Sequence, residues 1–225
     1  MNEITNDLKK ESNYEYNSYT FDSILNNFSE YFQNIPNELT IIAKHGWFID
    51  LEHSDLMFPN KIANYFKNKQ IEKANYELSN YYSTNIKRIF ETLISRHKER
   101  IDIFESILKC YYDKNYNVII PTLLTQIDGI CYDITKTKFF IRYNNHPAVL
   151  NTLNNKNINI MKIYLAPITE TIPIIKNERE SEQFICDLNR HEIIHGTRIT
   201  YGSKINSLKI ISLIKYISDI LHDLE

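Results

Sequence analysis

Glycine and proline are scarce in this chain, and their scarcity limits the folds that it can adopt. Among 225 residues there are 4 glycines and 6 prolines. β-Sandwiches and β-barrels need many tight turns, which glycine and proline form most readily. A chain of this length can also bury a full hydrophobic core. The sequence therefore predicts an all-α fold, with one main domain and an accessory extension.

Apolar residues recur at helical spacing along most of the chain. A helix is expected to begin behind Thr20, and Pro36 is expected to start a second one. The least regular segment, 135–179, predicts loops with one or two short helices. Further helices are predicted over 59–68, 72–95, 96–112, 117–134, 181–195 and 203–224. In this division residues 1–19 are a flexible arm, residues 20–95 a helical scaffold, and residues 96–225 a second helical domain.

The overall charge excludes a protein that coats nucleic acid over its whole surface. The formal net charge is −2 and the isoelectric point is about 6.4, so any nucleic-acid site must be a confined patch. The cysteines Cys110, Cys131 and Cys186 are far apart and contain no C-x-x-C pair, which favours reduced thiols. Residues 1–12 are polar and charged without an apolar stretch, so we expect no secretion signal, and no apolar run approaches the length of a membrane span. We therefore expect a cytoplasmic protein with no membrane partner.

Residues 189–196, NRHEIIHG, combine two motifs that imply different chemistry. Starting at His191 they match H-E-x-x-H, the zinc-protease motif in which two histidines bind the metal and the glutamate acts as general base. Starting at Arg190 they match R-x-x-x-x-H, which supplies a cation and a proton carrier without any metal. The two interpretations place the chemistry on different residues.

The zinc hypothesis lacks a clear third ligand. The extended protease motif would place glycine at 198 and histidine at 201, where this chain has Arg198 and Tyr201. The remaining candidates, Asp219, His222 and Asp223, lie close to the end of the chain. We therefore expect no metal and no other cofactor, and we interpret Glu192 as a solvated residue on the helix surface.

Arginine and histidine suit metal-free RNA cleavage. Attack by the 2′-hydroxyl of RNA needs a group that exchanges protons near neutral pH and a fixed cation for the developing negative charge. Arg190 and His195 are five residues apart, which on an ideal helix separates them by about 140°. To meet they need the long arginine side chain, a helix end at Gly196, or a second subunit across a two-fold axis.

The segment around the motif is locally basic, which favours a polyanionic partner. From Arg190 to Lys215 five basic residues oppose Glu192 alone, a balance of +4 within an acidic chain. Arg198, Lys204 and Lys209 of this segment are predicted to bind RNA. The alternative is that these residues simply solvate the face of a helix.

Two polar residues, Gln126 and Asp128, interrupt an otherwise apolar predicted helix. One hypothesis is that they face the motif helix and support its site. The other is that they are buried polar residues with partners inside a helical bundle.

The run from Leu188 to Gly196, followed by Tyr201 and a terminal amphipathic helix, resembles the R-x4-6-H signature of HEPN domains, a family of small all-helical proteins. His191 fits the polar position that follows the arginine in that family. The segment YNVIIPTLLTQIDGICYD, residues 116–133, is similar to the helix that packs against the motif helix in bacterial members. The resemblance covers roughly residues 96–225 and implies a HEPN-like helical bundle there.

The resemblance also implies a function. The implied function is that of a homodimeric, metal-independent endoribonuclease of phage-defence or toxin–antitoxin systems. Its active site would be formed by both subunits at the dimer interface, and an antitoxin or defence protein would be its partner. Arg190 would stabilise the scissile phosphate and His195 would act as general acid or base. Asn189 and His191 would support them, either by orienting them or by contacting phosphate, and Tyr201 is a further supporting residue. The alternatives are a catalytically silent module that binds RNA, a nucleotide or a protein, and, third, a zinc metallopeptidase.

Overall fold

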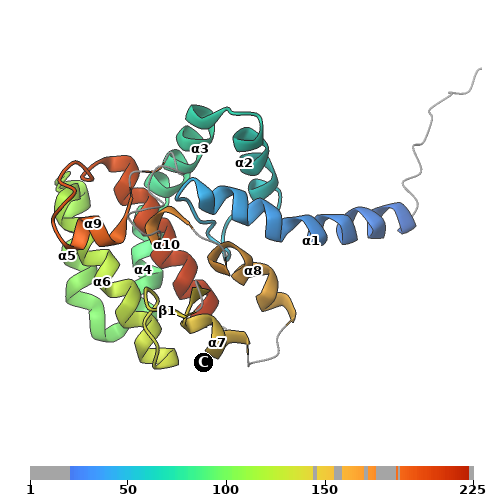
Figure 1. Cartoon of the computed structure of the whole chain (residues 1–225). Coiled ribbons are helices and arrows are strands. Elements are labelled where there is room, and N and C mark those ends of the chain that lie inside the picture. Colours follow the sequence, from blue (N-terminus) through green and yellow to red (C-terminus); the bar gives the residue numbers. More distant parts are fainter. Residues whose placement is uncertain are drawn as a thin grey trace, which may run out of the picture. The chain divides into compact units, whose positions relative to one another are not determined.

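The computed structural model describes residues 21–143, 146–154, 159–169, 172–175, 186 and 188–222. Their regular structure is almost entirely helical (Figure 1), and the predicted all-α fold is confirmed. The described strands form one small antiparallel hairpin, β1 (Arg142–Tyr143) with β2 (His146–Pro147). The chain divides into two compact units, Met1–Gln33 and Asn34–Glu225. The predicted arm, 1–19, lies outside the described residues.

The first two helices differ in how well the sequence predicts them. Helix α1 (Phe21–Lys44) runs through Pro36 without interruption, so the expected start of a second helix at this proline is wrong. Buried Ile35, Leu39 and Ile42 continue on one face past the proline, and this apolar burial favours a helix that does not stop. Helix α2 (Phe58–Lys67) lies where it is predicted.

The long helix predicted over 72–95 is two helices. Helix α3 (Ile71–Thr84) ends and α4 (Ile86–Arg96) begins at Asn85. The Asn85 amide donates to the Tyr81 carbonyl at 2.8 Å, and its oxygen accepts from Arg88 at 3.4 Å. Asparagine side chains compete in this way with the helical backbone ladder, which explains the break.

The later elements follow the predicted order. A 3-10 turn, η1 (Lys98–Arg100), leads into α5 (Ile101–Tyr112) and then α6 (Tyr116–Thr135). The region expected to be irregular contains, in its described part, the hairpin, α7 (Val149–Asn154), α8 (Asn159–Thr169) and the 3-10 turn η2 (Pro173–Ile175). Helices α9 (Arg190–Ile194) and α10 (Lys204–His222) follow. No helix in the described part of the chain is long and apolar enough to cross a membrane.

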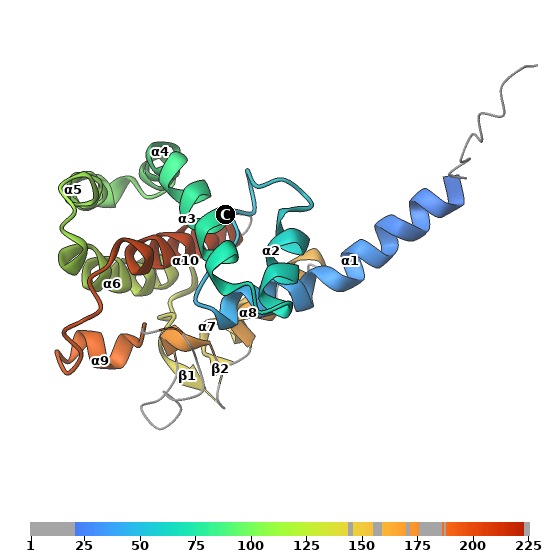
Figure 2. The same ribbon diagram turned by 90° about the horizontal axis from the view of Figure 1, so that it is seen from above.

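Helix α10 is the central helix of the unit 34–225. It packs against α3, α4 and α6, and both views show it alongside α6 (Figures 1 and 2). Every residue from Asn206 to Leu221 is buried, so the expectation of an amphipathic terminal helix is wrong. Its polar side chains have partners inside the protein; Ser212, for example, accepts the backbone N–H of Phe48 at 3.1 Å.

A buried lysine on α10 binds carboxylates from a distant part of the sequence. Lys215 is 0% exposed, and its ammonium donates to Asp50 at 2.9 Å and to Asp219 at 2.5 Å. A third bond, of 3.2 Å, reaches Glu52 in the segment after α1. Lys215 therefore joins that segment to the centre of the bundle.

Two arginines of α4 balance the negative charge of these carboxylates that Lys215 leaves uncompensated. Arg88 lies 3.0 Å from Asp50, and Arg96 contacts Asp219 at 2.6 Å and Glu52 at 2.9 Å. With Lys215, three cations thus face three carboxylates, and we call these six residues the ionic network. The network connects α4, α10 and the segment after α1. The predicted domain boundary between residues 95 and 96 stays a prediction.

The ionic network keeps Asp50 charged although it is buried. Burial raises the pKa of the Asp50 carboxyl, but the Lys215 ammonium, with hydrogen bonds from Lys215, Arg88 and Tyr81, lowers that pKa to about 2 overall. Asp50 is therefore ionised at neutral pH, and its negative charge depends on these partners for compensation.

Two half-buried histidines predict that the protein loses stability in mild acid. Burial, assisted by Lys209, lowers the pKa of His45 from 6.5 to about 4, and burial, assisted by Arg100 and Arg96, does the same for His97. Between these values the unfolded chain binds protons that the folded protein does not, so acid favours unfolding. The free energy of unfolding should therefore fall as the pH is lowered from about 6.5 to 4.

Urea unfolding at a series of pH values measures this slope. The variant His45→Gln with His97→Gln should flatten it, because neither glutamine titrates. A slope that is unchanged in the double variant would show that other groups cause the acid sensitivity.

Candidate functional site

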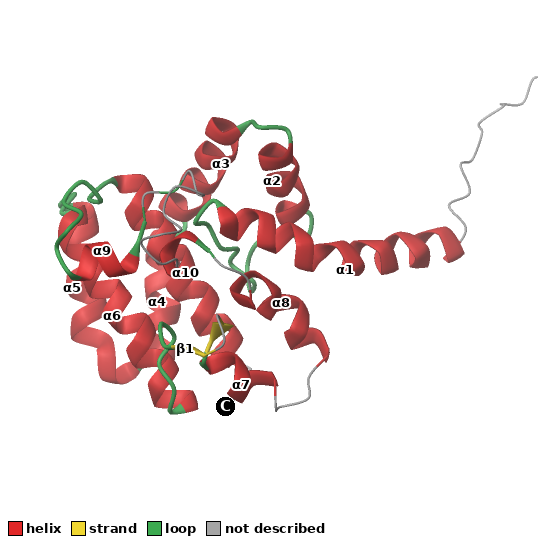
Figure 3. Ribbon diagram, in the orientation of Figure 1, coloured by secondary structure: helices red, strands yellow, loops and turns green. Residues whose placement is uncertain are grey.

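Helix α9 carries the motif and is much shorter than predicted (Figure 3). A helix is expected over 181–195, but residues 186, 188 and 189 are not helical, and 181–185 and 187 lie outside the described residues. Asn189 has an extended backbone, and its side-chain oxygen accepts the backbone N–H groups of His191 at 2.9 Å and Glu192 at 3.3 Å. This is an N-cap, and it starts the helix at Arg190.

Asn189 is completely buried, at 0% exposure. A residue in this position cannot contact the phosphate of a substrate, which was one of its two predicted roles. Capping α9 fits the other role, because the N-cap fixes where the side chains of Arg190 and His195 leave the helix. We therefore interpret Asn189 as a residue that orients the motif.

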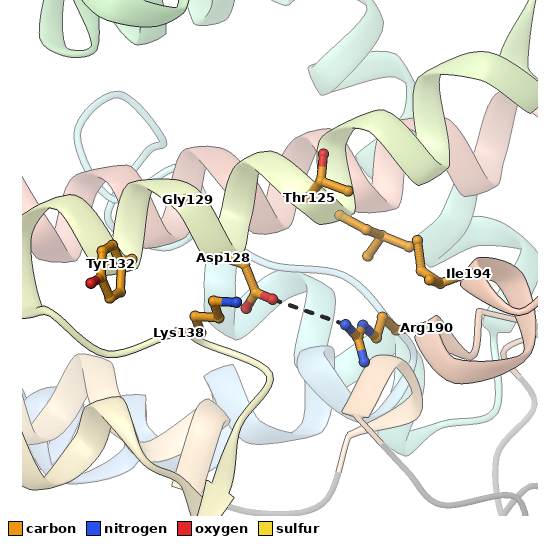
Figure 4. A pocket seen from close by; sticks show the side chains of 8 residues that line it. Thr125, Asp128, Gly129, Tyr132, Lys138, Arg190 and Ile194 are labelled. Atoms are coloured by element: carbon orange, nitrogen blue, oxygen red, sulfur yellow. Dashed lines mark ion pairs between the residues drawn. The ribbon is translucent and has the colours of Figure 1, made fainter.

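A pocket of about 330 Å³ lies between α6 and α9. Arg190 and Ile194 form its α9 side, and Lys138 from the loop after α6 lies beside Asp128 (Figure 4). One face of α6 forms the opposite wall with Leu124, Thr125, Asp128, Gly129 and Tyr132. The volume of the pocket is at the lower end of the range of about 300–1,000 Å³ that is usual for small-ligand sites.

Arg190 points from α9 toward α6 at the wall of this pocket (Figure 4). Its Nη2 lies 4.0 Å from Asp128 Oδ2, and its guanidinium carbon lies 5.2 Å from the centre of the Phe140 ring. Within the described part of the chain the guanidinium makes an ion pair and a ring contact but no hydrogen bond. The guanidinium can therefore donate to an anion.

The two polar residues of α6, Asp128 and Gln126, have different partners, and each fits one of the two hypotheses for them. Asp128 faces the motif helix, and its Oδ1 accepts the backbone N–H of Phe140 at 2.9 Å. Gln126 instead accepts a hydrogen bond from Arg100 at 2.8 Å inside the bundle. The first hypothesis thus describes Asp128 and the second describes Gln126.

The two histidines of the motif are exposed and lie close together. The ring centres of His191 and His195 are 4.3 Å apart, with the planes tilted by 57°. His195 is the C-cap of α9 and Gly196 follows with a positive φ of 72°, so the expected helix end at this glycine is observed. His195 does not line the pocket that contains Arg190. One chain therefore presents Arg190 and His195 on different sides of α9.

Glu192 and Arg198 hold the loop that follows α9. The Arg198 Nε donates to the Glu192 carboxylate, and the Glu192 carbonyl accepts the backbone N–H groups of Thr197 at 3.0 Å and Arg198 at 3.2 Å. The Glu192 side chain is only 15% exposed, so the interpretation of this residue as solvated is wrong. The charge of Arg198, predicted to bind RNA, is paired with this carboxylate.

The basic patch predicted along 190–215 is smaller on the surface than in the sequence. Lys209 and Lys215 are buried on α10, and Lys209 lies 3.5 Å from the Cys186 sulfur and 5.8 Å from the centre of the Trp47 ring. The prediction that Lys209 binds RNA is therefore wrong for this fold. Lys204, in the first turn of α10, is exposed. The sum of charges along the sequence overestimates the basic patch, because it also counts lysines on covered faces of a helix.

Tyr201 supports the end of α6 that lies near the motif. Its hydroxyl donates to the Asn117 carbonyl at 3.2 Å. Pro121, four residues later in α6, has no N–H for that carbonyl, so Tyr201 satisfies an acceptor that the proline leaves open. A side chain on Gly202 would overlap the Asn117 amide, since its Cβ would lie 1.4 Å from Oδ1. Residues 201–202 thus dock the loop after α9 onto α6.

The three possible third zinc ligands differ in state, and one of them, His222, is exposed at the end of α10. Asp219 is bound by Lys215 and Arg96, and Asp223 is not among the described residues. The structure, over the residues that it describes, has no group of three or more His, Cys, Asp or Glu side chains placed to hold a metal ion.

Lys138 and Phe140 belong to the site but are not among the predicted residues. They lie in the loop after α6, and neither stands in a motif or in an apolar period. The N-cap of α9 has a recognisable signal, since an asparagine three residues before a glutamate is typical of a helix start.

Comparison with known proteins gives no match for this chain: no family model, curated protein or solved structure matches it. The resemblance of the motif to HEPN domains therefore stays a prediction, and the geometry of the site is the basis for proposing a function.

Proposed function

We propose that this chain is a cytoplasmic, metal-independent endoribonuclease of the HEPN type, active as a homodimer. The observation that carries the proposal is the Arg190 guanidinium, which faces a pocket and makes no hydrogen bond within the described residues. An arginine in this state is suited to bind a phosphate through two parallel hydrogen bonds. The exposed His195 at the end of the same helix supplies a proton carrier.

The proposed reaction uses the 2′-hydroxyl of the RNA as nucleophile. His195 takes the proton from this hydroxyl, and the oxygen attacks the adjacent phosphorus. The bond from phosphorus to the 5′-oxygen breaks, and the leaving oxygen takes a proton from solvent. Arg190 stabilises the additional negative charge on the phosphorane. The products are a 2′,3′-cyclic phosphate and a 5′-hydroxyl, and no metal is required.

A second copy of the chain completes the site in this proposal. Because Arg190 and His195 lie on different sides of α9, a two-fold axis beside this helix would place the Arg190 of one copy near the His195 of the other. His191, whose ring contacts that of His195, would orient it. The resemblance to HEPN proteins is the ground for proposing a role in phage defence or toxin–antitoxin systems, with an antitoxin or defence partner.

Cleavage of RNA in the presence of a chelator tests this function. The purified full chain should cleave RNA equally with and without EDTA and leave 2′,3′-cyclic phosphate ends, identified by mass spectrometry. His195→Ala should lower the rate by about 10²–10⁴-fold, the range for general acid–base catalysis. His222→Ala is the matched control, because His222 is an exposed histidine at the end of α10.

The other outcomes identify the alternatives. RNA that is bound but stays intact would show a catalytically silent module. Stoichiometric zinc together with a peptidase activity that the chelator removes would show the metallopeptidase.

A further inference from the structure

The pocket between α6 and α9 has two cations whose donors are open. Arg190 and Lys138 both line it, and in Figure 4 they stand on opposite sides of Asp128. Over the described residues the structure gives Lys138 no hydrogen bond or ion pair, and it gives Arg190 only its 4.0 Å ion pair and its contact with Phe140. The pocket can therefore bind a phosphate at one cation and still offer a donor at the other.

Asp128 places an open acceptor between these cations. Its Oδ1 takes the N–H of Phe140 at 2.9 Å. Its Oδ2 lies 4.0 Å from Arg190, which is too far for a hydrogen bond. The Asp128 side chain is 19% exposed, so this oxygen is partly desolvated and gains from a donor on a ligand.

The other lining residues suit a flat, apolar ring. Leu124 and Ile194 come from facing helices, and the Tyr132 ring is about half exposed. Unstacked RNA bases are bound in such surroundings by stacking and by hydrogen bonds to their edges. A nucleobase therefore fits the pocket better than a small inorganic anion alone.

Guanine matches this arrangement of charges. A carboxylate needs N–H donors, and guanine is the RNA base that presents two neighbouring donors, N1–H and N2–H, on its pairing edge. Its O6 lies beside these two donors. This oxygen can accept a hydrogen bond from a lysine that lies next to the carboxylate. Uracil presents a single donor between two acceptors, and the carboxylate repels these acceptors.

We infer that the pocket between α6 and α9 binds a guanine of the substrate, with Asp128 accepting N1–H and N2–H and Lys138 donating to O6. The inference rests on the proposed ribonuclease function, because it takes the pocket as the place of the nucleotide next to the scissile phosphate. It makes Asp128 and Lys138 residues that determine base specificity.

Equilibrium binding of GMP, AMP, CMP and UMP to the full chain tests the inference. GMP should bind at least about tenfold more tightly than UMP, as expected for a bidentate contact to a base. Asp128→Asn should bring the two affinities within about twofold, because the new amide opposes the guanine donors while its oxygen can still accept the N–H of Phe140.

Two further variants make the result specific. Lys138→Gln should also reduce the preference for GMP, and Lys138 is exposed, so this substitution leaves the fold intact. Asp113→Asn, at an exposed aspartate that ends α5, should bind the four nucleotides as the unchanged chain does. Equal binding of all four nucleotides, or a GMP preference that survives Asp128→Asn, would overturn the inference.

Mapping of the cleaved positions in RNA separates this inference from the proposed function. Cleavage beside every base alike would refute the guanine pocket and leave the ribonuclease in place. A GMP preference that depends on Asp128, in a chain that cleaves no RNA, would support the pocket and refute the ribonuclease.

Discussion

Arg190→Ala is expected to lower the rate of RNA cleavage by at least about a hundredfold, the usual effect of removing one group that stabilises charge in the transition state. The fold should be unaffected, because the described contacts of this side chain are a 4.0 Å ion pair with Asp128 and the ring of Phe140. Arg190→Lys keeps the charge but loses the planar fork of donors, so its rate should be intermediate. Single-turnover kinetics with the protein in excess measure these rates.

The control for Arg190→Ala is a cation on a helix that does not line the pocket. Lys87, an exposed residue of α4, contacts Glu91 on the same helix, and Lys87→Ala should cleave like the unchanged chain. If Arg190→Ala cleaves RNA as fast as the unchanged chain does, the reaction takes place elsewhere on the molecule.

Lys215→Met is expected to destabilise the protein by about 3–5 kcal/mol, the cost of removing one partner from a buried ion pair. The substitution leaves Asp50 and Asp219 buried without their shared ammonium. For a chain of this size the loss corresponds to roughly 10 °C in the melting temperature. Urea unfolding followed by circular dichroism measures the change in the free energy of unfolding.

Two further variants identify the cause of this loss. Lys204→Met lies on the same helix but at an exposed position, and it should change the stability by less than about 0.5 kcal/mol. Combining Lys215→Met with Asp219→Asn removes a charge of each sign and should recover part of the loss, because the two residues are in contact. A loss no larger than that of Lys204→Met would show that the ionic network does not stabilise the fold.

The sequence predicts helices well where the apolar period and the helix ends agree. Helices α2, α5, α6 and α10 lie close to their predicted ranges. Pro36 misleads, whereas the helix through Pro121 is predicted. A helix passes through a proline when its apolar face continues or when a neighbour can satisfy the freed carbonyl. Pro36 in α1 shows the first effect. Pro121 shows the second, because the Tyr201 hydroxyl donates to the Asn117 carbonyl that the proline leaves open.

The burial of α10 could not be predicted from its own sequence. Lys209 and Lys215 give it the appearance of a surface helix. Lys215 is nevertheless buried, and it binds Asp50, which is 165 residues away in the sequence. Periodicity and local charge report only on neighbours along the chain. The same limit explains why a basic patch that includes Lys209 is predicted but not formed.

The candidate site is predictable where local residues determine it. Asn189 and Glu192 contain the signal for the short motif helix, and the R-x-x-x-x-H spacing already separates Arg190 from His195. The pocket itself needs Asp128 from α6 and Lys138 from the loop after it, more than 50 residues away. Asp128 is a candidate from the sequence, because it interrupts an apolar helix, but no motif marks Lys138, which is visible only in the structure.

Mixing two inactive variants tests most directly whether Arg190 and His195 of different copies form one metal-independent site. Arg190→Ala and His195→Ala are each expected to be inactive alone. After co-refolding in equal amounts, half of the dimers should contain one of each and retain one of two sites, so about one quarter of the activity should return in the presence of EDTA. A mixture as inactive as its components, while the unchanged chain cleaves RNA, would contradict the shared site.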